Sequence, residues 1–411
     1  MASRDTPRPV PDYTICYVRN RPKTRHPALA LIGCADLADE DIAQLVWLAG
    51  ADRVTIGVAP RRAGPFRKNP RPSEIELRVR DEFVAKRHAV LERRPDGWWL
   101  LDAGSRHGTF AAGKRRAKHR LRPGDVFETG RTFWRYLEHA WLAAPPASVE
   151  AAELGPTRTI CPRLIEELCW TRQLAPSISP VIILGESGVG KDVLARQIHA
   201  WSGRKGFFKA VNCAALDEKE LFGCATGSMA KAARDMGGQI DAATEGTLLL
   251  DQIDELPPVT QAKLIGVLEA GEFHRLGESR PRAVSARFIA TIMTPDFGWL
   301  MSEGKLREDL YARFVHAVRL VPLRERVEDL GILLSHVLRS STGLRPRISR
   351  LDPAAFRRLL AYSWPLNVRE FECRVRQALR VAGGSPVLSL EHLALPTEIP
   401  RKARPPDRKR P

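Results

Sequence analysis

The stretch Val181-Ile-Ile-Leu-Gly-Glu-Ser-Gly-Val-Gly-Lys-Asp192 decides the local fold of this chain. Its apolar start predicts a buried strand, and the pattern after Lys191 predicts a helix. Between them, Gly185-x-x-x-x-Gly190-Lys191 has the spacing of a phosphate-binding loop, whose glycines let backbone N–H groups turn toward an anion. The helix N-terminus and the Lys191 ammonium add positive charge. We therefore expect nucleotide phosphates at Gly185, Glu186, Ser187, Gly188, Val189, Gly190, Lys191 and Asp192.

Around this loop, apolar runs alternate with helical patterns over residues 159–322. The alternation predicts an α/β domain with a mostly parallel sheet that is covered on both faces. Residues 323–397 are helical in pattern, and the basic, proline-rich residues 398–411 predict a disordered tail. Strands are expected at Val181–Leu184, Phe208–Val211, Thr247–Asp251, Arg287–Thr291 and Ala317–Leu320, with helices such as Asp192–Trp201 and Gln261–Ala270 between them.

The first part of the chain carries short β-type runs separated by turns. This spacing predicts an all-β sandwich or barrel over residues 51–140. In the N-terminal extension, residues 1–50, the apolar stretch 28–49 is expected to supply a strand and a helix, and residues 141–158 are expected to form a linker. The β-type runs are Arg53–Gly57, His88–Glu92, Gly97–Asp102 and Thr109–Phe110.

Composition limits the class of protein. A chain of 411 residues with 44% hydrophobic and 27% charged residues is typical of a soluble protein with two or three domains. It has no secretory signal, no apolar run of membrane-spanning length and no Cys-x-x-Cys, which favours a cytoplasmic protein with reduced thiols. The net charge of +17 lies in the two flanks. These flanks either contact nucleic acid or an acidic partner, or reflect the arginine bias of a GC-rich genome.

Asp192 stands where phosphate-binding loops usually place the Ser or Thr that binds Mg²⁺. With this feature, residues from about Thr159 to Leu395 resemble the AAA+ domain of bacterial enhancer-binding activators of sigma-54 RNA polymerase, whose loop usually reads Gly-Glu-Ser-Gly-Thr-Gly-Lys-Glu. The resemblance implies ATP and Mg²⁺ as cofactors, a helical lid over residues 323–397, a ring-like homo-oligomer and sigma-54 RNA polymerase as partner. Matching pieces include Val211–Leu216, Glu220–Gly223, Gly246–Asp251, Arg307–Tyr311, Pro322–Arg326 and Trp364–Glu370.

The resemblance assigns catalytic roles, and one of them is lost. Asp251 matches the family residue that holds the Mg²⁺–water cluster, but Gln252 replaces the glutamate that polarises the attacking water. A neutral amide orients water without accepting its proton, so we expect ATP to bind and hydrolysis to be slow. Asn212 matches the residue that switches the missing glutamate. Asp254 is close in sequence but is expected to point elsewhere.

Residues that sense the γ-phosphate are partly retained. Met293 occupies the first sensor position, normally Asn, and a thioether is only a weak acceptor. Arg307 and Arg313 match the arginines that reach a neighbouring subunit, and Arg369 matches the second sensor on the lid. The alternative is that these arginines form ordinary surface salt bridges.

The loop that contacts the sigma factor in the family is altered. It normally reads Gly-Ala-Phe-Thr-Gly-Ala, and here Met229 takes the Phe position and Ala230 the Thr position. Methionine still offers a flexible apolar contact, whereas nothing replaces the threonine hydroxyl. The aligned residues are Gly227, Ser228, Met229, Ala230, Lys231 and Ala232.

The β-rich module resembles a forkhead-associated (FHA) domain, a sandwich that binds phosphothreonine peptides. Its framework is retained, with Ser105 and a mainly structural His88, but three expected phosphate contacts are Val58, Ala85 and His107. Either the module serves packing or protein contact alone, or nearby cations form a substitute anion site. Those cations are Arg61, Arg62, Lys86, Arg87 and Arg106.

Two functions remain open from sequence. The chain is a divergent sigma-54-type transcriptional regulator with impaired hydrolysis, or it is a pseudo-ATPase scaffold that recruits a protein partner through its FHA-like module. Too few residues follow Leu395 for a helix-turn-helix, so no sequence-specific DNA-binding domain is expected.

Overall fold

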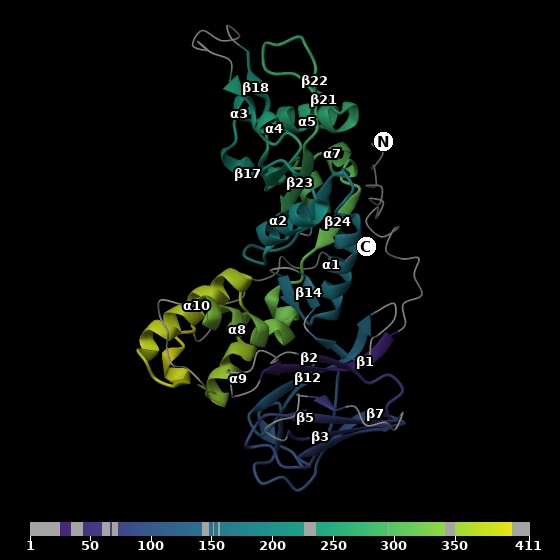
Figure 1. Cartoon of the computed structure of the whole chain (residues 1–411), viewed down its shortest axis with the longest axis vertical. Coiled ribbons are helices and arrows are strands. Elements are labelled where there is room, and N and C mark those ends of the chain that lie inside the picture. Colours follow the sequence, from purple (N-terminus) through teal and green to yellow (C-terminus); the bar gives the residue numbers. More distant parts are fainter. Residues whose placement is uncertain are drawn as a thin grey trace, which may run out of the picture.

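The computed structural model describes residues 25–33, 44–59, 66–67, 73–141, 148–150, 152–154, 157–225, 236–294, 296–341 and 350–396. A β-rich module occupies one end of the molecule and an α/β domain the other, with a helical lid beside the junction between them (Figure 1). Among the described residues, no helix is long and apolar enough to cross a membrane.

The β-rich module is the sandwich that the sequence predicts. One sheet has the order β13-β2-β1-β12-β11-β8-β9 and the other β10-β7-β6-β3-β5-β4. Alternate residues of β5 are buried, as expected when one sheet face packs on a core, and Trp98 and Trp134 lie in that core. The strands are β1 (Arg25–Gly33), β2 (Gln44–Trp47), β3 (Arg53–Val58), β4 (Phe66–Arg67), β5 (Glu74–Val79), β6 (Ala89–Arg94), β7 (Gly97–Asp102), β8 (Thr109–Ala111), β9 (Lys114–Arg115), β10 (Lys118–Arg120), β11 (Val126–Thr129), β12 (Thr132–Trp141) and β13 (Ser148–Glu150).

Two local predictions in this region are wrong. The second half of residues 28–49 supplies strand β2 where a helix was expected, and β13 pairs with β2 inside the stretch expected to be a linker. Every residue of β2 is buried, and Leu45 and Trp47 share a cluster with Ile160 and Ile332 of the α/β domain and lid. A strand covered on both faces loses its polar alternation, so periodicity does not distinguish it from a buried helix.

The α/β domain has a five-stranded parallel sheet in the order β17-β20-β23-β16-β24. The predicted strands are confirmed to within a residue or so, and their carboxyl ends meet at one edge of the sheet. The strands are β16 (Val181–Leu184), β17 (Phe208–Asn212), β20 (Thr247–Asp251), β23 (Arg287–Ile292) and β24 (His316–Arg319), and the helices are α1 (Pro162–Leu174), α2 (Lys191–Ser202), α3 (Glu218–Phe222), α4 (Gln239–Ala242), α5 (Pro258–Ala270), α6 (Phe297–Ser302) and α7 (Glu308–Ala312). Short strand pairs are β14 (Ala152–Leu154) with β15 (Thr157–Thr159), β18 (Gly223–Cys224) with β19 (Met236–Gly237), and β21 (Glu272–Phe273) with β22 (Arg282–Ala283).

The lid is helical, as predicted, and its apolar helix faces pack around Trp364 and Phe371. Two residues of the β-rich module, Ile32 and Phe133, belong to the same core cluster. The lid elements are α8 (Leu330–Ser340), α9 (Pro353–Ala361), α10 (Asn367–Ala382), β25 (Arg350–Leu351) and β26 (Val387–Leu388). Single 3-10 turns are η1 (Cys213–Ala215), η2 (Ile253–Glu255), η3 (Leu323–Glu325), η4 (Val327–Asp329) and η5 (Leu390–His392).

Candidate nucleotide site

The phosphate-binding loop connects β16 to α2, as the sequence predicts. Gly188 and Gly190 have φ angles of 72° and 108°, in the left-handed region that glycine adopts without strain. A Cβ atom on Gly188 would also lie 2.2 Å from the Leu366 carbonyl oxygen of the lid. Glycine is therefore required at Gly188 both by the backbone turn and by the close approach of the lid.

Lys191 follows this loop as the first residue of α2. Its side chain is buried, and its Nζ donates hydrogen bonds to the carbonyl oxygens of Gly185 at 2.7 Å and Glu186 at 3.1 Å. Burial lowers the pKa of Lys191, and the nearby Asp251 carboxylate opposes that shift. The ammonium is thus a buried cation whose present partners are neutral carbonyls, which an incoming phosphate group can replace.

Asp251 ends β20 next to β23, and Thr291 of β23 fixes its carboxylate. The Thr291 Oγ1 donates to Asp251 Oδ1 at 2.5 Å and accepts the Gln252 backbone N–H at 3.0 Å. Gln252 has φ 59° and ψ 61°, the left-handed conformation, at the point where the strand turns into η2. Sequence reasoning missed Thr291, because a threonine inside an apolar strand has no distinguishing pattern.

Asp254 lies close enough to Lys191 for each charge to influence the pKa of the other. One of its carboxylate oxygens is buried and has no hydrogen-bond partner in the described part of the chain. Burial raises the pKa of Asp254, and Glu255 adds to that shift. Asp254 is therefore linked electrostatically to Lys191.

The lid contacts the loop through Arg324 and Asn367, whose roles the sequence did not predict, and through the backbone of the predicted second sensor, Arg369. Arg324 donates to both carboxylate oxygens of Glu186, at 2.7 and 2.6 Å, and these bonds lower the pKa of Glu186. Asn367, which is fully buried, donates to Glu186 at 3.1 Å and to the Ser187 carbonyl at 3.0 Å. The Arg369 backbone N–H bonds to the Gly188 carbonyl at 3.2 Å.

The remaining predicted site residues lie around this centre. The Asn212 side chain accepts the Ala214 N–H at 3.0 Å and so caps η1. The Arg369 side chain is exposed, and its charge depresses the pKa of Lys191 after the larger effect of burial. Met293 is 41% exposed. The exposed Arg307 and Arg313 are paired within this chain, with Asp309 and Glu269 respectively.

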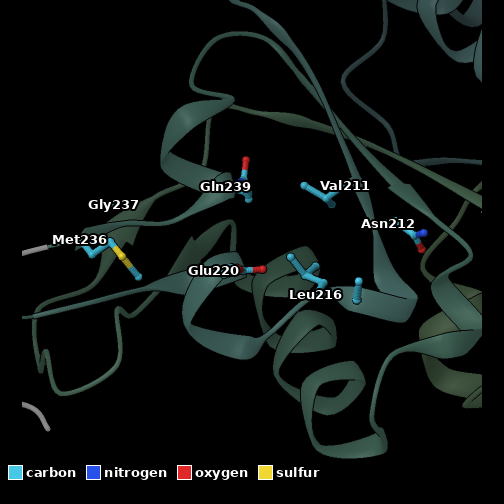
Figure 2. Close-up of a pocket in the computed structure, with 8 residues that line it drawn as sticks. Val211, Asn212, Leu216, Glu220, Met236, Gly237 and Gln239 are labelled. Atoms are coloured by element: carbon cyan, nitrogen blue, oxygen red, sulfur yellow. The ribbon is translucent and has the colours of Figure 1, made fainter. Parts of the chain in front are cut away.

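A pocket of about 340 Å³ opens beyond the end of β17 (Figure 2). Asn212 borders it on one side and Met236 on the other, and no residue of the phosphate-binding loop lines it. The predicted sigma-contact residues Gly227, Ser228, Met229, Ala230, Lys231 and Ala232 lie outside the described residues. The pocket is lined by Val211, Asn212, Ala215, Leu216, Glu220, Met236, Gly237 and Gln239.

The FHA-like pocket residues bond among themselves. His88 is buried, and its Nδ1 accepts the Ala85 N–H at 3.2 Å while its Nε2 lies 3.1 Å from the Gly108 carbonyl oxygen. The Ser105 hydroxyl donates to Asp102 at 2.6 Å and accepts the Gly108 N–H at 3.0 Å. These retained polar groups therefore bond within the loop framework, as expected of a mainly structural His88.

Three of the five cations proposed as a substitute anion site lie in the described part of the chain. Arg61 and Arg62 lie outside the described residues, whereas Lys86, Arg87 and Arg106 are exposed. His107 packs edge-on against Phe83, with ring centroids 5.0 Å apart. In the usual position of the arginine, Val58 bonds through its backbone alone: its N–H donates to the Ala85 carbonyl at 3.1 Å, and its carbonyl oxygen accepts a long 3.4 Å hydrogen bond from Arg78.

Known proteins similar to this chain share its central domain. Regulatory protein AtoC of Escherichia coli (strain K12) is 40% identical over 247 residues, which are 58% of this chain and 53% of AtoC. The Sigma54-dependent transcriptional activator SfnR of Pseudomonas putida is 37% identical over 255 residues, which are 60% of this chain and 69% of SfnR. This chain belongs to the sigma-54-dependent transcriptional activator family.

The matched domains agree with the observed architecture. The Sigma-54 interaction domain matches residues 161–320, the AAA+ ATPase lid domain residues 324–410 and the FHA domain residues 67–130. The crystal structure of NtrX from Brucella abortus in complex with ATP has 30% sequence identity and a TM-score of 0.52, over 59% of this chain and 57% of NtrX. An FHA domain is therefore followed by an AAA+ domain of the sigma-54 activator fold, although the chain spans only about half the length of AtoC.

The acidic residues of this activator-type site suit Mg²⁺. Asp251 ends β20 and influences the pKa of Lys191 in the phosphate-binding loop, and Asp192 is exposed in the first turn of α2. Mg²⁺ is usually held by one or two carboxylates together with phosphate oxygens and water. Among the described residues, no three His, Cys, Asp or Glu side chains form a complete cage for a metal. Asp251 and Asp192 are thus the side chains that would hold the ion, which would neutralise phosphate charge.

Proposed function

We propose that this chain is an ATP-binding regulator of transcription of the sigma-54-dependent type, and that Gln252 makes its ATP hydrolysis slow. The observation that carries the proposal is the glycine turn after β16, against whose carbonyl oxygens the buried Lys191 ammonium is held, near enough to Asp251 for that carboxylate to raise the pKa of Lys191. NtrX structures with ATP and with ADP, which have this fold, support nucleotide as the ligand.

Slow hydrolysis follows from the chemistry of Gln252. Thr291 holds the backbone of Gln252 and the carboxylate of Asp251, so the pair has a defined position. The Gln252 amide can donate to and accept from a water molecule, but it is not basic enough to take up its proton. Without a proton acceptor the chemical step of hydrolysis is slow, whereas phosphate binding by Lys191 is unaffected.

Assembly into a ring-like homo-oligomer is part of the proposal. Arg307 and Arg313 are exposed, as residues that complete a neighbouring subunit's site must be. Each is paired within its own subunit through a solvent-exposed salt bridge. Exposed pairs of this kind contribute at most about 1 kcal/mol, so both arginines can exchange a carboxylate for a neighbour's phosphate.

The proposed target is sigma-54 RNA polymerase, contacted through Gly227–Ala232. A second candidate function is a pseudo-ATPase scaffold that recruits a protein partner through the FHA domain without acting on sigma-54. Gln252 and the exposed Met293 favour this alternative, because both changes affect hydrolysis and γ-phosphate sensing while leaving the phosphate-binding loop complete. The two candidates share ATP binding and differ in whether the chain acts on sigma-54 RNA polymerase.

Calorimetric titration of wild-type protein and Lys191→Ala with ATP tests the shared step. Loss of charge-assisted hydrogen bonds worth about 1.5–3 kcal/mol should weaken ATP binding about tenfold to a hundredfold. Lys205→Ala, which removes an exposed lysine of the same domain, is the matched control and should bind as wild type does. Equal ATP affinity in Lys191→Ala and Lys205→Ala would contradict the proposed site.

A further inference from the structure

One face of the FHA domain packs against the lid. Strands β1 and β12 lie against the lid helices in Figure 1, and the Phe133 and Phe356 rings are 4.6 Å apart. Gly33 is packed so closely that a Cβ atom there would lie 2.8 Å from the Phe356 ring. Because Ile32 and Phe133 share one core with lid residues, the FHA domain and the lid are joined through apolar packing.

Two ion pairs whose carboxylates are buried lie at the same interface. Arg357 of α9 donates to both carboxylate oxygens of Glu128, at 2.8 and 2.6 Å, and Glu128 is only 5% exposed. Arg135 of β12 pairs with Glu328, which is 2% exposed. A carboxylate that is buried beside its partner disfavours separation, since an undocked domain leaves that charge without its arginine.

Arg135 contacts a short segment of the chain that also forms hydrogen bonds with the phosphate-binding loop. This segment, Arg324–Asp329, contains the last two residues of η3 and the whole of η4. On one side Arg324 binds the Glu186 carboxylate, and the Arg326 guanidinium donates to the Val189 carbonyl at 3.1 Å. On the other side the segment's Glu328 is bound by Arg135.

The segment is also tied to the chain that connects the two domains. Asp329 is 1% exposed and accepts the Thr159 hydroxyl at 2.8 Å and the Ile160 N–H at 2.9 Å. Six consecutive residues therefore contact the phosphate-binding loop, the FHA domain and the interdomain connection at once. Arg135 also donates a long hydrogen bond to the Glu325 carbonyl oxygen of this segment, at 3.4 Å.

We propose that the segment Arg324–Asp329 couples docking of the FHA domain on the lid to nucleotide binding at Gly185–Lys191. The inference rests on the proposed ATP binding and assigns its regulation. Anchoring Glu186 and Val189 holds the loop in one conformation before nucleotide arrives, which lowers the ordering cost of binding. FHA docking favours ATP binding, and by thermodynamic reciprocity ATP favours FHA docking. Any partner that pulls the FHA domain off the lid weakens ATP binding.

The affinity test uses the full chain and removes the FHA side of the connection. Arg135→Ala should bind ATP about fivefold more weakly, or worse, by calorimetry, although Arg135 is not part of the nucleotide site. Arg120→Ala is the matched control, because Arg120 pairs with Asp96 within the FHA domain. It should bind ATP as wild type does. A folded Arg135→Ala protein with wild-type ATP affinity would overturn the coupling.

Hydrogen exchange of the wild-type protein tests the reverse direction and needs no variant. ATP should slow amide exchange in β12, which faces the lid, more than in β7 of the opposite sheet. Equal effects on β12 and β7, or none on either, would overturn the coupling while leaving the proposed ATP binding intact. Wild-type protein that binds no ATP in calorimetry would overturn both proposals together.

Discussion

The Thr291 hydroxyl and the Asp251 carboxylate are joined by a 2.5 Å hydrogen bond between neighbouring strands. The same hydroxyl oxygen accepts the Gln252 N–H at 3.0 Å, so one side chain holds both the expected Mg²⁺ ligand and the altered catalytic position. Thr291 is fully buried, and its two bonds have no solvent substitute. The position of Gln252 is thus set by the neighbouring strand as well as by its own turn.

Thr291→Val should loosen this arrangement without changing the size of the side chain. It leaves a backbone N–H and a carboxylate oxygen without their hydroxyl partner, at a cost of about 1–3 kcal/mol. The free energy of opening β20 and β23, measured by native-state hydrogen exchange, should fall by that amount. Thr291→Ser keeps the hydroxyl and should lose clearly less. Equal losses in the two variants would show that packing, and not the hydroxyl, matters here.

The sequence predicts the strands around this site well because they are short apolar runs with clear ends. The strand at Val181–Leu184 and the glycine loop after it are local patterns, and so is the acidic end of β20. Contacts between distant residues have no such signal. Glu186 meets Arg324 and Asn367 only because the lid folds back over the loop, and each residue alone is an ordinary polar side chain.

In the FHA domain, too, the sequence predicts local features but not contacts between distant residues. The loss of side-chain phosphate contacts at Val58 and Ala85 is readable from sequence, whereas β2 is not, because burial on both faces removes its alternation. The docking of β11 and β12 on the lid depends on Glu128 and Phe133, which from sequence are ordinary strand residues. Interfaces between domains are therefore the part of this molecule that local pattern reveals least.

The FHA domain should not distinguish phosphothreonine peptides from their unphosphorylated forms. Val58 and Ala85 have no polar side-chain atoms, and the Ser105 hydroxyl is already bonded to Asp102 and the Gly108 N–H. Fluorescence anisotropy of the full chain against a peptide library, before and after phosphatase treatment, checks this. Tight binding that disappears on dephosphorylation would show that exposed cations such as Lys86 and Arg106 supply the missing contacts, and Lys86→Ala with Arg106→Ala would then abolish it.

His88 should make the FHA domain sensitive to acid. Burial lowers the pKa of His88 in the folded domain, and its Nδ1 must be unprotonated to accept the Ala85 N–H. The stability that this histidine provides is complete above its unfolded pKa of about 6.5 and is lost as pH falls through the folded pKa, at up to about 1.4 kcal/mol per pH unit.

Hydrogen exchange in β6 and β8, corrected for intrinsic rates, should therefore show a lower opening free energy at pH 5.5 than at pH 7.5. His88→Gln removes the titrating group and should reduce that difference. If the wild-type and His88→Gln proteins depend on pH equally, another group is responsible.

The central claim, that ATP binds and Gln252 slows its hydrolysis, is tested most directly by comparing turnover in wild-type protein and Gln252→Glu. The carboxylate restores a proton acceptor, a function that usually contributes about 10²–10⁴-fold. The control is Gln173→Glu, which makes the same change at an exposed position of α1 and should leave turnover unaltered. Because Arg307 and Arg313 act across a subunit boundary in the proposed ring, any gain should increase with protein concentration. Gln252→Glu with Met293→Asn should exceed either change alone.

The measurement is steady-state phosphate release at saturating ATP and Mg²⁺, over a range of protein concentrations. We predict wild-type turnover far below an ordinary enzymatic rate of about 1 s⁻¹ and a large increase in Gln252→Glu. Wild-type turnover at about 1 s⁻¹ or above would contradict the account. The proton acceptor would then be another group, and Asp254, which has an unpartnered buried carboxylate oxygen and interacts electrostatically with Lys191, is the first to replace by Asn.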